Sequence, residues 1–389
     1  MDFRFTDEQQ MLRDSLRRFL EGRYPFELRI AASRSVMGLP SGMWRAFADE
    51  LGILGAGFAE DRGGTGGGPV EHMIIMEELG RALALEPYLE TIVIGAEILS
   101  RSESRLARET LESVLRGELI LAFAWAEQGM AEDFTGISTR ATREENGWRL
   151  TGCKTLVTAA PWASHLILAA RASGAAGDAS GISLFLVDKA QAGITTCEFP
   201  TVDGRRACDI TFDNVLIPGD ALLGHDGSAL SLVEETADRA VAAMCAEAVG
   251  IMSRLLDLTM EYTKQRSQFG KALASFQVLQ HRMADMLMEL ELATSAVYLA
   301  TLKLGAPADE RAKAASAAKA TICTAGKFVG QNAIQLHGAM GMTDELAVGH
   351  YFKRLMAIGS EFGGEDFHRG RFASGAKVAR SAAVATKLQ

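Results

Sequence analysis

The chain has 389 residues, 48% of them hydrophobic, and a formal net charge of −9. That length allows roughly two or three structural units with a substantial core. The acidic balance argues against nucleic acid as the main ligand, because phosphate backbones require a basic surface. The five cysteines are scattered without a CxxC pair, which indicates neither a disulfide framework nor a zinc site. With no secretory signal and no apolar stretch of bilayer-spanning length, we expect a cytoplasmic protein without membrane insertion.

Residues 1–118 have the pattern of an N-terminal helical domain. Thr6 followed by Gln9 has the spacing of a capping box and predicts the start of a helix. The apolar spacing from Trp44 to Leu54 predicts another helix that ends at Gly55. The glycine-rich run at 63–68 lacks the Lys-Ser/Thr of a P-loop, so we interpret it as a flexible connection before a helix over 70–84.

Residues 119–225 change to a strand pattern and predict a middle antiparallel β domain, as a barrel or a sandwich. Asn146-Gly147 lies between two strand-like runs, which is typical of a hairpin. Further strand-like runs occupy 119–125, 155–157, 166–169, 182–187, 195–199 and 209–212.

Residues 226–389 return to helix-forming residues and predict a C-terminal helical bundle. Within it, the Phe269-Gly270 pair marks a loop between two helices. Arg266, beside this loop, is placed to bind a phosphate group bidentately. Taken alone, it is also compatible with an exposed arginine at a helix end.

Two segments carry a resemblance to a known family. Arg266-Ser267-Gln268-Phe269-Gly270, followed by Phe276-Gln277, resembles the FAD-binding signature of the acyl-CoA dehydrogenase family, and Gln335-Leu336-His337-Gly338-Ala339-Met340-Gly341 resembles its other C-terminal flavin motif. The resemblance covers nearly the whole chain and implies an α+β fold in α-β-α order. It also implies FAD-dependent α,β-dehydrogenation of an acyl-CoA thioester, with electrons passing to an electron-transfer flavoprotein.

The resemblance assigns site residues position by position. The implied FAD-binding residues are Thr158, Arg266, Gln268, Phe269, Gln277, Gln335, Leu336, His337, Gly338 and Ala339. Thr158 stands where the family hydrogen-bonds the N5 edge of the flavin. No metal site is expected, because His337 has no second ligand at metal-binding spacing. Glu132, in the loop 127–133 that lies beside flavin and CoA in the family, and Arg239, which matches an arginine close to the CoA adenine, are the implied substrate-binding residues.

The usual catalytic base is absent. Anchoring on Lys353-Arg354 places Gly363 where most members carry a glutamate, and a glycine cannot remove the proton α to the thioester carbonyl. Some members carry the base on an earlier helix, immediately before the arginine that matches Arg239, and that position is Asp238. An equally simple interpretation of Asp238 is an acid near a helix N-terminus that complements the helix dipole.

Three runs resemble the pimeloyl-CoA dehydrogenase small-subunit group, whose members are often paired with a larger subunit. They are Thr201-Val202-Asp203-Gly204, Cys245-Ala246-Glu247-Ala248-Val249-Gly250 and Val348-Gly349-His350-Tyr351-Phe352-Lys353-Arg354. We therefore expect a homo-oligomer, or a hetero-oligomer with a larger homologous subunit. Two alternatives to a dehydrogenase stay open, namely a cofactor-holding or structural subunit without its own base, and a flavin oxidase or monooxygenase.

Overall fold

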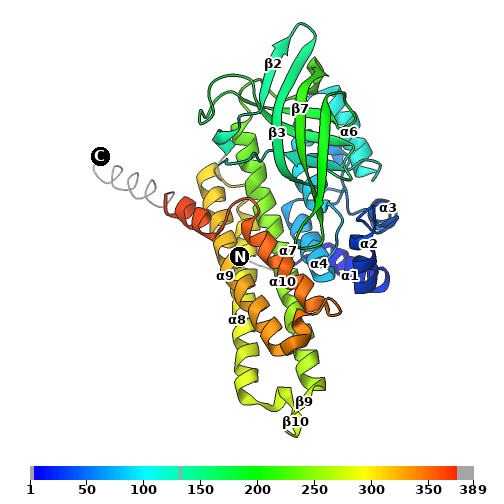
Figure 1. Ribbon diagram of the computed structural model, residues 1–389, viewed down its shortest axis with the longest axis vertical. Helices are drawn as coiled ribbons and strands as arrows, with labels where there is room; N and C mark the ends of the chain where they lie inside the picture. The colour runs from blue at the N-terminus through cyan, green and yellow to red at the C-terminus, as the bar shows by residue number, and fades with distance from the viewer. Residues whose placement is uncertain (1–3, 131–133, 375–389) are drawn as a thin grey trace, which may run out of the picture. The chain divides into compact units, whose positions relative to one another are not determined.

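A computed structural model describes residues 4–130 and 134–374 of the chain (Figure 1). By their internal contacts the residues form two compact units. One comprises residues 1–27, 69–84 and 241–389, and the other comprises residues 28–68 and 85–240.

The helices of the N-terminal third are short and connected by turns. They are α1 (Asp7–Arg23), α2 (Phe26–Arg34), α3 (Met43–Asp49), the 3-10 turn η1 (Glu60–Arg62), α4 (Pro69–Ala82), the π-helix η2 (Leu89–Ala96), α5 (Glu97–Ser100) and α6 (Arg105–Leu115). Thr6 caps α1 in the expected capping box, since its side chain accepts from the Gln9 N–H and the Gln9 side chain accepts from the Thr6 N–H. The prediction that this helix ends at Gly55 is wrong, because α3 ends at Asp49. Gly52, at φ 63°, then takes a left-handed conformation that stops the helix.

The middle part contains the predicted strands. They are β1 (Leu121–Ala124), β2 (Arg140–Glu144), β3 (Gly147–Thr158), β4 (His165–Arg171), β5 (Ile182–Asp188), β6 (Ile194–Pro200), β7 (Arg206–Pro218) and β8 (Leu222–Leu223), with 3-10 turns η3 (Phe134–Gly136) and η4 (Gly219–Ala221). The hairpin at Asn146-Gly147 is confirmed as the β2–β3 connection. The strands form one sheet in the order β6-β7-β3-β2-β4-β5-β8, and β1 adds to β4.

The sheet is mainly antiparallel, as predicted, but β4 pairs in parallel with both β1 and β2. Two of the predicted runs are parts of longer strands: 155–157 belongs to β3 and 209–212 to β7. Both strands are interrupted by register shifts, so the alternation of apolar residues breaks within each strand. A buried cluster centred on Trp148 and Phe185 packs one face of the sheet.

The C-terminal part is helical. It contains α7 (Leu230–Gln265), the short strands β9 (Ser267–Gln268) and β10 (Lys271–Ala272), η5 (Leu273–Ser275), α8 (Gln277–Leu302), α9 (Ala308–His337), η6 (Gly338–Met342) and α10 (Ala347–Ser360). Helices α8 and α9 pack side by side as an antiparallel pair (Figure 1). Among the described residues, the helices lack an apolar segment long enough to cross a membrane.

Candidate cofactor and active site

The hairpin that follows α7 positions the first flavin motif. Phe269 and Gly270, at φ 54° and 78°, form its tip between β9 and β10. The Arg266 N–H donates to the Tyr262 carbonyl at 2.8 Å, and the Arg266 carbonyl accepts from the Leu273 N–H at 2.8 Å. The backbone of Arg266 is therefore held at both its polar groups, while its side chain is exposed.

One pocket brings the two flavin motifs together. Its volume is about 370 Å³, and it is lined by Tyr262, Arg266, Gln268, Leu273, Leu279, Gln335, Leu336, His337, Gly338, Ala339 and Met340. Seven of the ten predicted FAD-binding residues lie in this lining, although the two motifs are far apart in the chain. The structure therefore brings these seven residues together, and their binding of a cofactor stays a prediction.

The residues of this pocket fit the phosphate and ring parts of a dinucleotide. Gly338 adopts φ 60°, and a Cβ added there would meet nothing within 4 Å, so the backbone is open to close approach. The exposed Arg266 guanidinium supplies the charge that a phosphate requires. Gln268 and Gln335 add side-chain amides that can donate and accept.

His337 contributes to the shape of the pocket. Its ring stacks on Tyr262 with centroids 4.4 Å apart, and its Nδ1 lies 2.8 Å from the Ala333 carbonyl. Burial lowers the pKa of His337, which favours the neutral ring. The described residues contain no cluster of His, Cys, Asp and Glu that could hold a metal ion.

Three predicted FAD-binding residues lie outside this pocket. Phe269 is 89% exposed at the hairpin tip, and Gln277 is exposed at the first position of α8. Thr158 is the last residue of β3, where it is half-buried and pairs in register with Ala207. Their contact with a cofactor stays a prediction.

Glu127, which opens the loop predicted to lie beside flavin and CoA, has a structural role. It forms a buried ion pair with Lys154 at 2.7 Å and accepts from the Thr139 N–H at 3.0 Å. Although burial opposes the charged form, Lys154 and the hydrogen bonds lower the pKa of Glu127 to about 2. Glu132, from the same loop, lies outside the described residues.

The structure is closed around Gly363, the position that the resemblance assigns to the base. This glycine has φ 101°, and an added Cβ would lie 2.4 Å from Cδ1 of Phe367 and 3.1 Å from Nε2 of His368. Two of the neighbouring carboxylates are held in ion pairs: Glu361 binds Arg354 at 2.6 Å, and Glu365 pairs with Arg369. Neither takes the position that the alignment gives to the base.

The alternative base, Asp238, is almost completely buried, with 1% exposure. Helix α7 begins at Leu230, so Asp238 lies beyond the first turn, and the helix-dipole interpretation loses its basis. Arg239 is engaged in an ion-pair network, at 3.1 Å from Glu235 and 3.4 Å from Glu97. Its contact with CoA stays a prediction.

Two of the runs that resemble the small-subunit group meet in space. Glu247 of α7 and Arg354 of α10 form a buried ion pair at 2.7 Å. Gly250 lies so close to α4 that an added Cβ would be 1.9 Å from the Glu77 carbonyl. These two runs therefore determine how α4, α7 and α10 pack.

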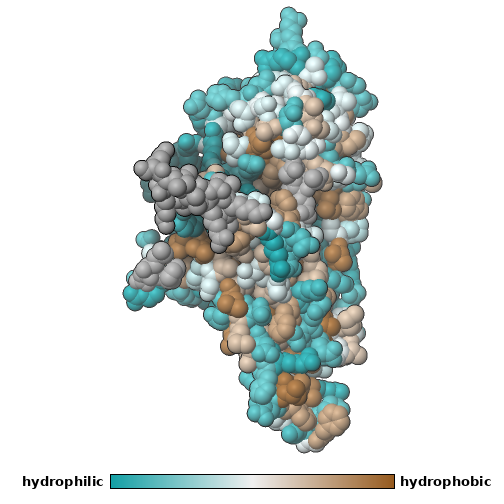
Figure 2. Space-filling model, turned by 90° about the vertical axis from the view of Figure 1, so that its left-hand side faces the viewer, coloured by the Kyte–Doolittle hydropathy of each residue, from teal (hydrophilic) through white to brown (hydrophobic). Residues whose placement is uncertain are grey.

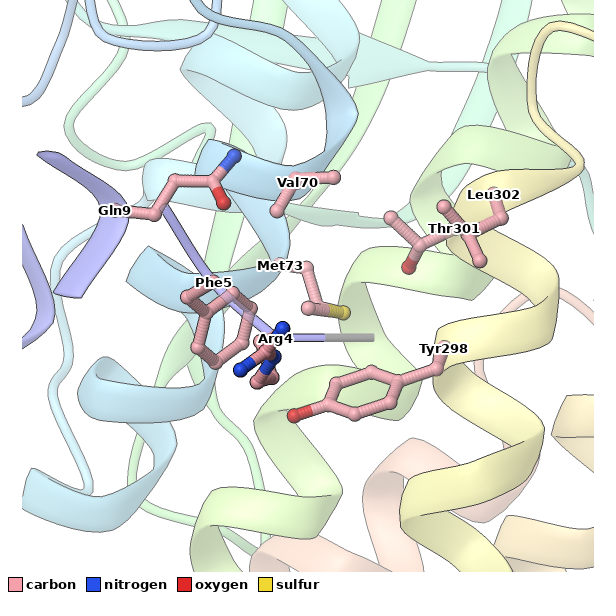
Figure 3. Close-up of a pocket in the computed structure, with 8 residues that line it drawn as sticks. All are labelled: Arg4, Phe5, Gln9, Val70, Met73, Tyr298, Thr301 and Leu302. Atoms are coloured by element: carbon pink, nitrogen blue, oxygen red, sulfur yellow. The ribbon is translucent and has the colours of Figure 1, made fainter. Parts of the chain in front are cut away.

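A second pocket, of about 180 Å³, lies among α1, α4 and α8 (Figure 3). It is lined by Arg4, Phe5, Gln9, Val70, Met73, Tyr298, Thr301 and Leu302. The Phe5 and Tyr298 rings meet edge to face, with centroids 6.0 Å apart. None of the predicted site residues lines it, so it is separate from the candidate cofactor pocket.

Comparison with known families covers nearly all of the chain. The acyl-CoA dehydrogenase N-terminal domain matches residues 6–118, the middle domain matches 122–215, and the C-terminal domain matches 230–377. The chain belongs to the acyl-CoA dehydrogenase family of flavoprotein oxidoreductases. The predicted fold, with helical, β and helical domains in that order, is confirmed.

Individual relatives are distant in sequence, but the similarity extends over at least nine-tenths of each chain. The caffeyl-CoA reductase-Etf complex subunit CarC of Acetobacterium woodii is 29% identical, over 90% of this chain and 93% of CarC. A variant of the Tcur3481-Tcur3483 steroid ACAD is 28% identical with a TM-score of 0.86, over 97% of this chain and 99% of that one. The FAD complex of PigA is 26% identical with a TM-score of 0.87, over 97% of this chain and 100% of that one.

Sequence reasoning missed several residues that shape these sites. Leu273 lines the cofactor pocket, and Lys154 neutralises Glu127. Tyr262 begins the stretch that contains Arg266, but its stacking on His337 depends on the packing of α7 against the end of α9. A lysine in an otherwise half-buried strand was the available signal for Lys154.

Proposed function

We propose that this chain binds FAD and takes part in the α,β-dehydrogenation of an acyl-CoA thioester, as the small subunit of a two-subunit enzyme. The observation that carries the proposal is the pocket in which Arg266 and Gln268 meet residues 335–339. The FAD complex of PigA supports the cofactor, and the caffeyl-CoA reductase-Etf complex subunit CarC supports a CoA thioester as the substrate class. We also propose the domain division 1–118, 119–225 and 226–389, and a cytoplasmic location.

Arg266, Gln268 and residues 335–339 would hold the pyrophosphate and adenosine of FAD, and Thr158 would contact its ring. Phe269 and Gln277 would extend this site from the hairpin and from the start of α8. When bound, FAD supplies the acceptor for the hydride that leaves the β-carbon. The remaining chemistry is removal of the α-proton, which requires a carboxylate in a site that excludes water.

Asp238 is the carboxylate that we propose for this step within the chain, because its burial excludes bulk water. Its oxygen would take the α-proton as the hydride departs, so that the double bond forms as two C–H bonds break. Arg239 and Glu132 would lie near the CoA portion. The reduced cofactor would pass its electrons to an electron-transfer flavoprotein, which the Etf-complex subunit CarC supports.

The surface of the hairpin and α8 supports association with a second chain, either a copy or a larger homologue. Besides Phe269, α8 exposes a stripe of apolar side chains: Val278, Met288, Leu292, Leu299 and Leu302 are each at least 50% exposed. Figure 2 shows apolar surface among hydrophilic groups on the side where α8 lies in Figure 1. Because stripes of this kind mark interaction sites, the cofactor pocket would be completed by a partner. The steroid ACAD, named for two chains, supports a heteromer.

Anaerobic titration with acyl-CoA thioesters of differing bulk tests the proposal. We expect protein purified with FAD to lose its oxidised flavin absorbance and to recover it with an electron-transfer flavoprotein. Rapid recovery in air alone would indicate an oxidase. Bleaching that needs an added larger homologue would indicate a cofactor-holding subunit, which the closed geometry at Gly363 favours as the second candidate. Purification without flavin, both alone and with such a homologue, would refute the proposal.

A further inference from the structure

Strand β3 contains a bulge directly before Thr158. Its register with β7 runs through Lys154↔Ile210 and resumes at Val157↔Cys208, so Thr155 and Leu156 together oppose the single residue Asp209. This two-against-one arrangement is a β-bulge, a feature that often re-aims a side chain next to an active site.

The bulge determines on which face of the sheet the last side chains of β3 lie. Lys154 and Val157 are buried, with exposures of 0% and 2%, whereas Leu156 is 54% exposed. Side chains alternate along a strand, so without the extra residue Leu156 and Thr158 would share the buried face with Lys154. The insertion instead puts Leu156 and the half-buried Thr158 on the other face.

The conformation at the bulge is unfavourable for the residue that adopts it. Leu156 has φ 50°, in the left-handed region that branched side chains rarely occupy. Because the ladder is broken there, its N–H also needs an acceptor outside the regular β3–β7 pairing.

Asp209 supplies this acceptor. Its Oδ1 accepts from the Leu156 N–H at 2.9 Å, and the neighbouring Thr155 N–H donates to the Ala126 carbonyl at 2.9 Å. The carboxylate that faces the bulge is thus the side chain that fixes its left-handed residue.

We propose that Asp209 is a positioning residue for the flavin site, because it holds the bulge that turns Leu156 and Thr158 to the outer face of the sheet. This inference rests on the proposed function, in which that face meets the flavin ring. Asp209 does not itself touch the cofactor in this proposal, so its effect reaches the flavin through the backbone of β3.

Three variants of the full-length chain test it. Asp209→Ala removes the acceptor, and Asp209→Asn keeps an acceptor oxygen without the charge. Asp213→Ala removes a carboxylate on the same strand that contacts its neighbour Asn214. The measurements are amide hydrogen exchange of the peptide containing Leu156 in cofactor-free protein, the dissociation constant for FAD, and the visible spectrum of bound flavin.

For Asp209→Ala we expect exchange at the bulge to speed by roughly tenfold or more, as for a lost hydrogen bond to a charged group. FAD binding to Asp209→Ala should weaken by a similar factor, and the spectrum of the bound flavin should shift. Asp209→Asn should recover most of the FAD affinity and of the spectrum. Asp213→Ala should equal the parent in all three measurements. Faster exchange with unchanged FAD affinity and spectrum would overturn the positioning role alone. Unchanged exchange would overturn the role of Asp209 in the bulge. A parent that binds no FAD, alone or with a larger homologue, would overturn the proposed function together with this inference.

Discussion

Placing a side chain at Gly363 should destabilise the protein and should not restore a catalytic base. The backbone at φ 101° costs an L-residue about 1–2 kcal/mol. A Cβ only 2.4 Å from Phe367 adds an overpacking penalty of about 1–3 kcal/mol. Together, Gly363→Ala should lower the free energy of unfolding by roughly 2–5 kcal/mol.

Thermal unfolding measures this effect. For a cooperative unit of 150–250 residues, the loss corresponds to a fall in Tm of at least about 4 °C. Gly370→Ala is the matched control, because Gly370 lies nearby without a positive φ and an added Cβ would meet nothing within 4 Å. Gly363→Glu should be at least as unstable and should not gain flavin-bleaching activity. A Gly363→Ala protein as stable as the parent, or a Gly363→Glu protein with faster bleaching, would refute the reasoning.

Three further predictions concern the charged residues. Arg266→Ala should fold but bind FAD about 10- to 100-fold more weakly, because it loses a charge-assisted contact. The control Arg282→Ala, at an exposed position of α8, should bind FAD normally. Full flavin occupancy in Arg266→Ala would eliminate Arg266 as the anchor. If the chain alone reduces its flavin, Asp238→Asn should slow stopped-flow bleaching by about 10²–10⁴-fold with FAD still bound, and an unchanged rate would eliminate Asp238. The pKa of Glu127 is lowered to about 2 from 4.5, so its contribution to stability is complete above pH 4.5 and is lost as pH falls toward 2. Glu127→Gln should flatten that part of the pH–stability curve. It should also lower the free energy of unfolding at neutral pH by about 3–5 kcal/mol, because a buried lysine loses its charged partner. If denaturant unfolding gave parallel pH–stability curves for the parent and Glu127→Gln, this prediction would be contradicted.

The parts of the fold that depend on local signals were predictable. Thr6 and Gln9 mark the start of α1, and Asn146-Gly147 marks the β2–β3 hairpin, because capping and turn chemistry involve neighbouring residues. The end of α3 was not predictable, since apolar spacing continues past Asp49 although the backbone turns at Gly52.

The candidate site was predictable to the extent that motifs carry it. The motif containing Arg266 and the motif beginning at Gln335 were both read from the sequence, and the structure joins them in one pocket. The role of Asp209 depends on a register shift between β3 and β7, which no local pattern specifies. The sequence also shows a glycine at 363 without showing that Phe367 fills the space beside it.

For the proposed dehydrogenation, the geometry around Gly363 limits which residues can act as the catalytic base. Residues 365–374 are helical and include Phe367 and His368, whose side chains pack beside this glycine. The His368 Nε2 lies 3.0 Å from the Phe362 carbonyl. Glu361 is held by Arg354, whose guanidinium is also paired with buried Glu247, so moving Glu361 toward a substrate would break its 2.6 Å ion pair with Arg354. A loop stabilised in this way presents backbone at the position that the family resemblance assigns to the base glutamate. In the function that we propose, the proton would be taken by a carboxylate from another element, either Asp238 within this chain or a residue of a larger partner. Whether the isolated chain bleaches its own flavin distinguishes these two sources.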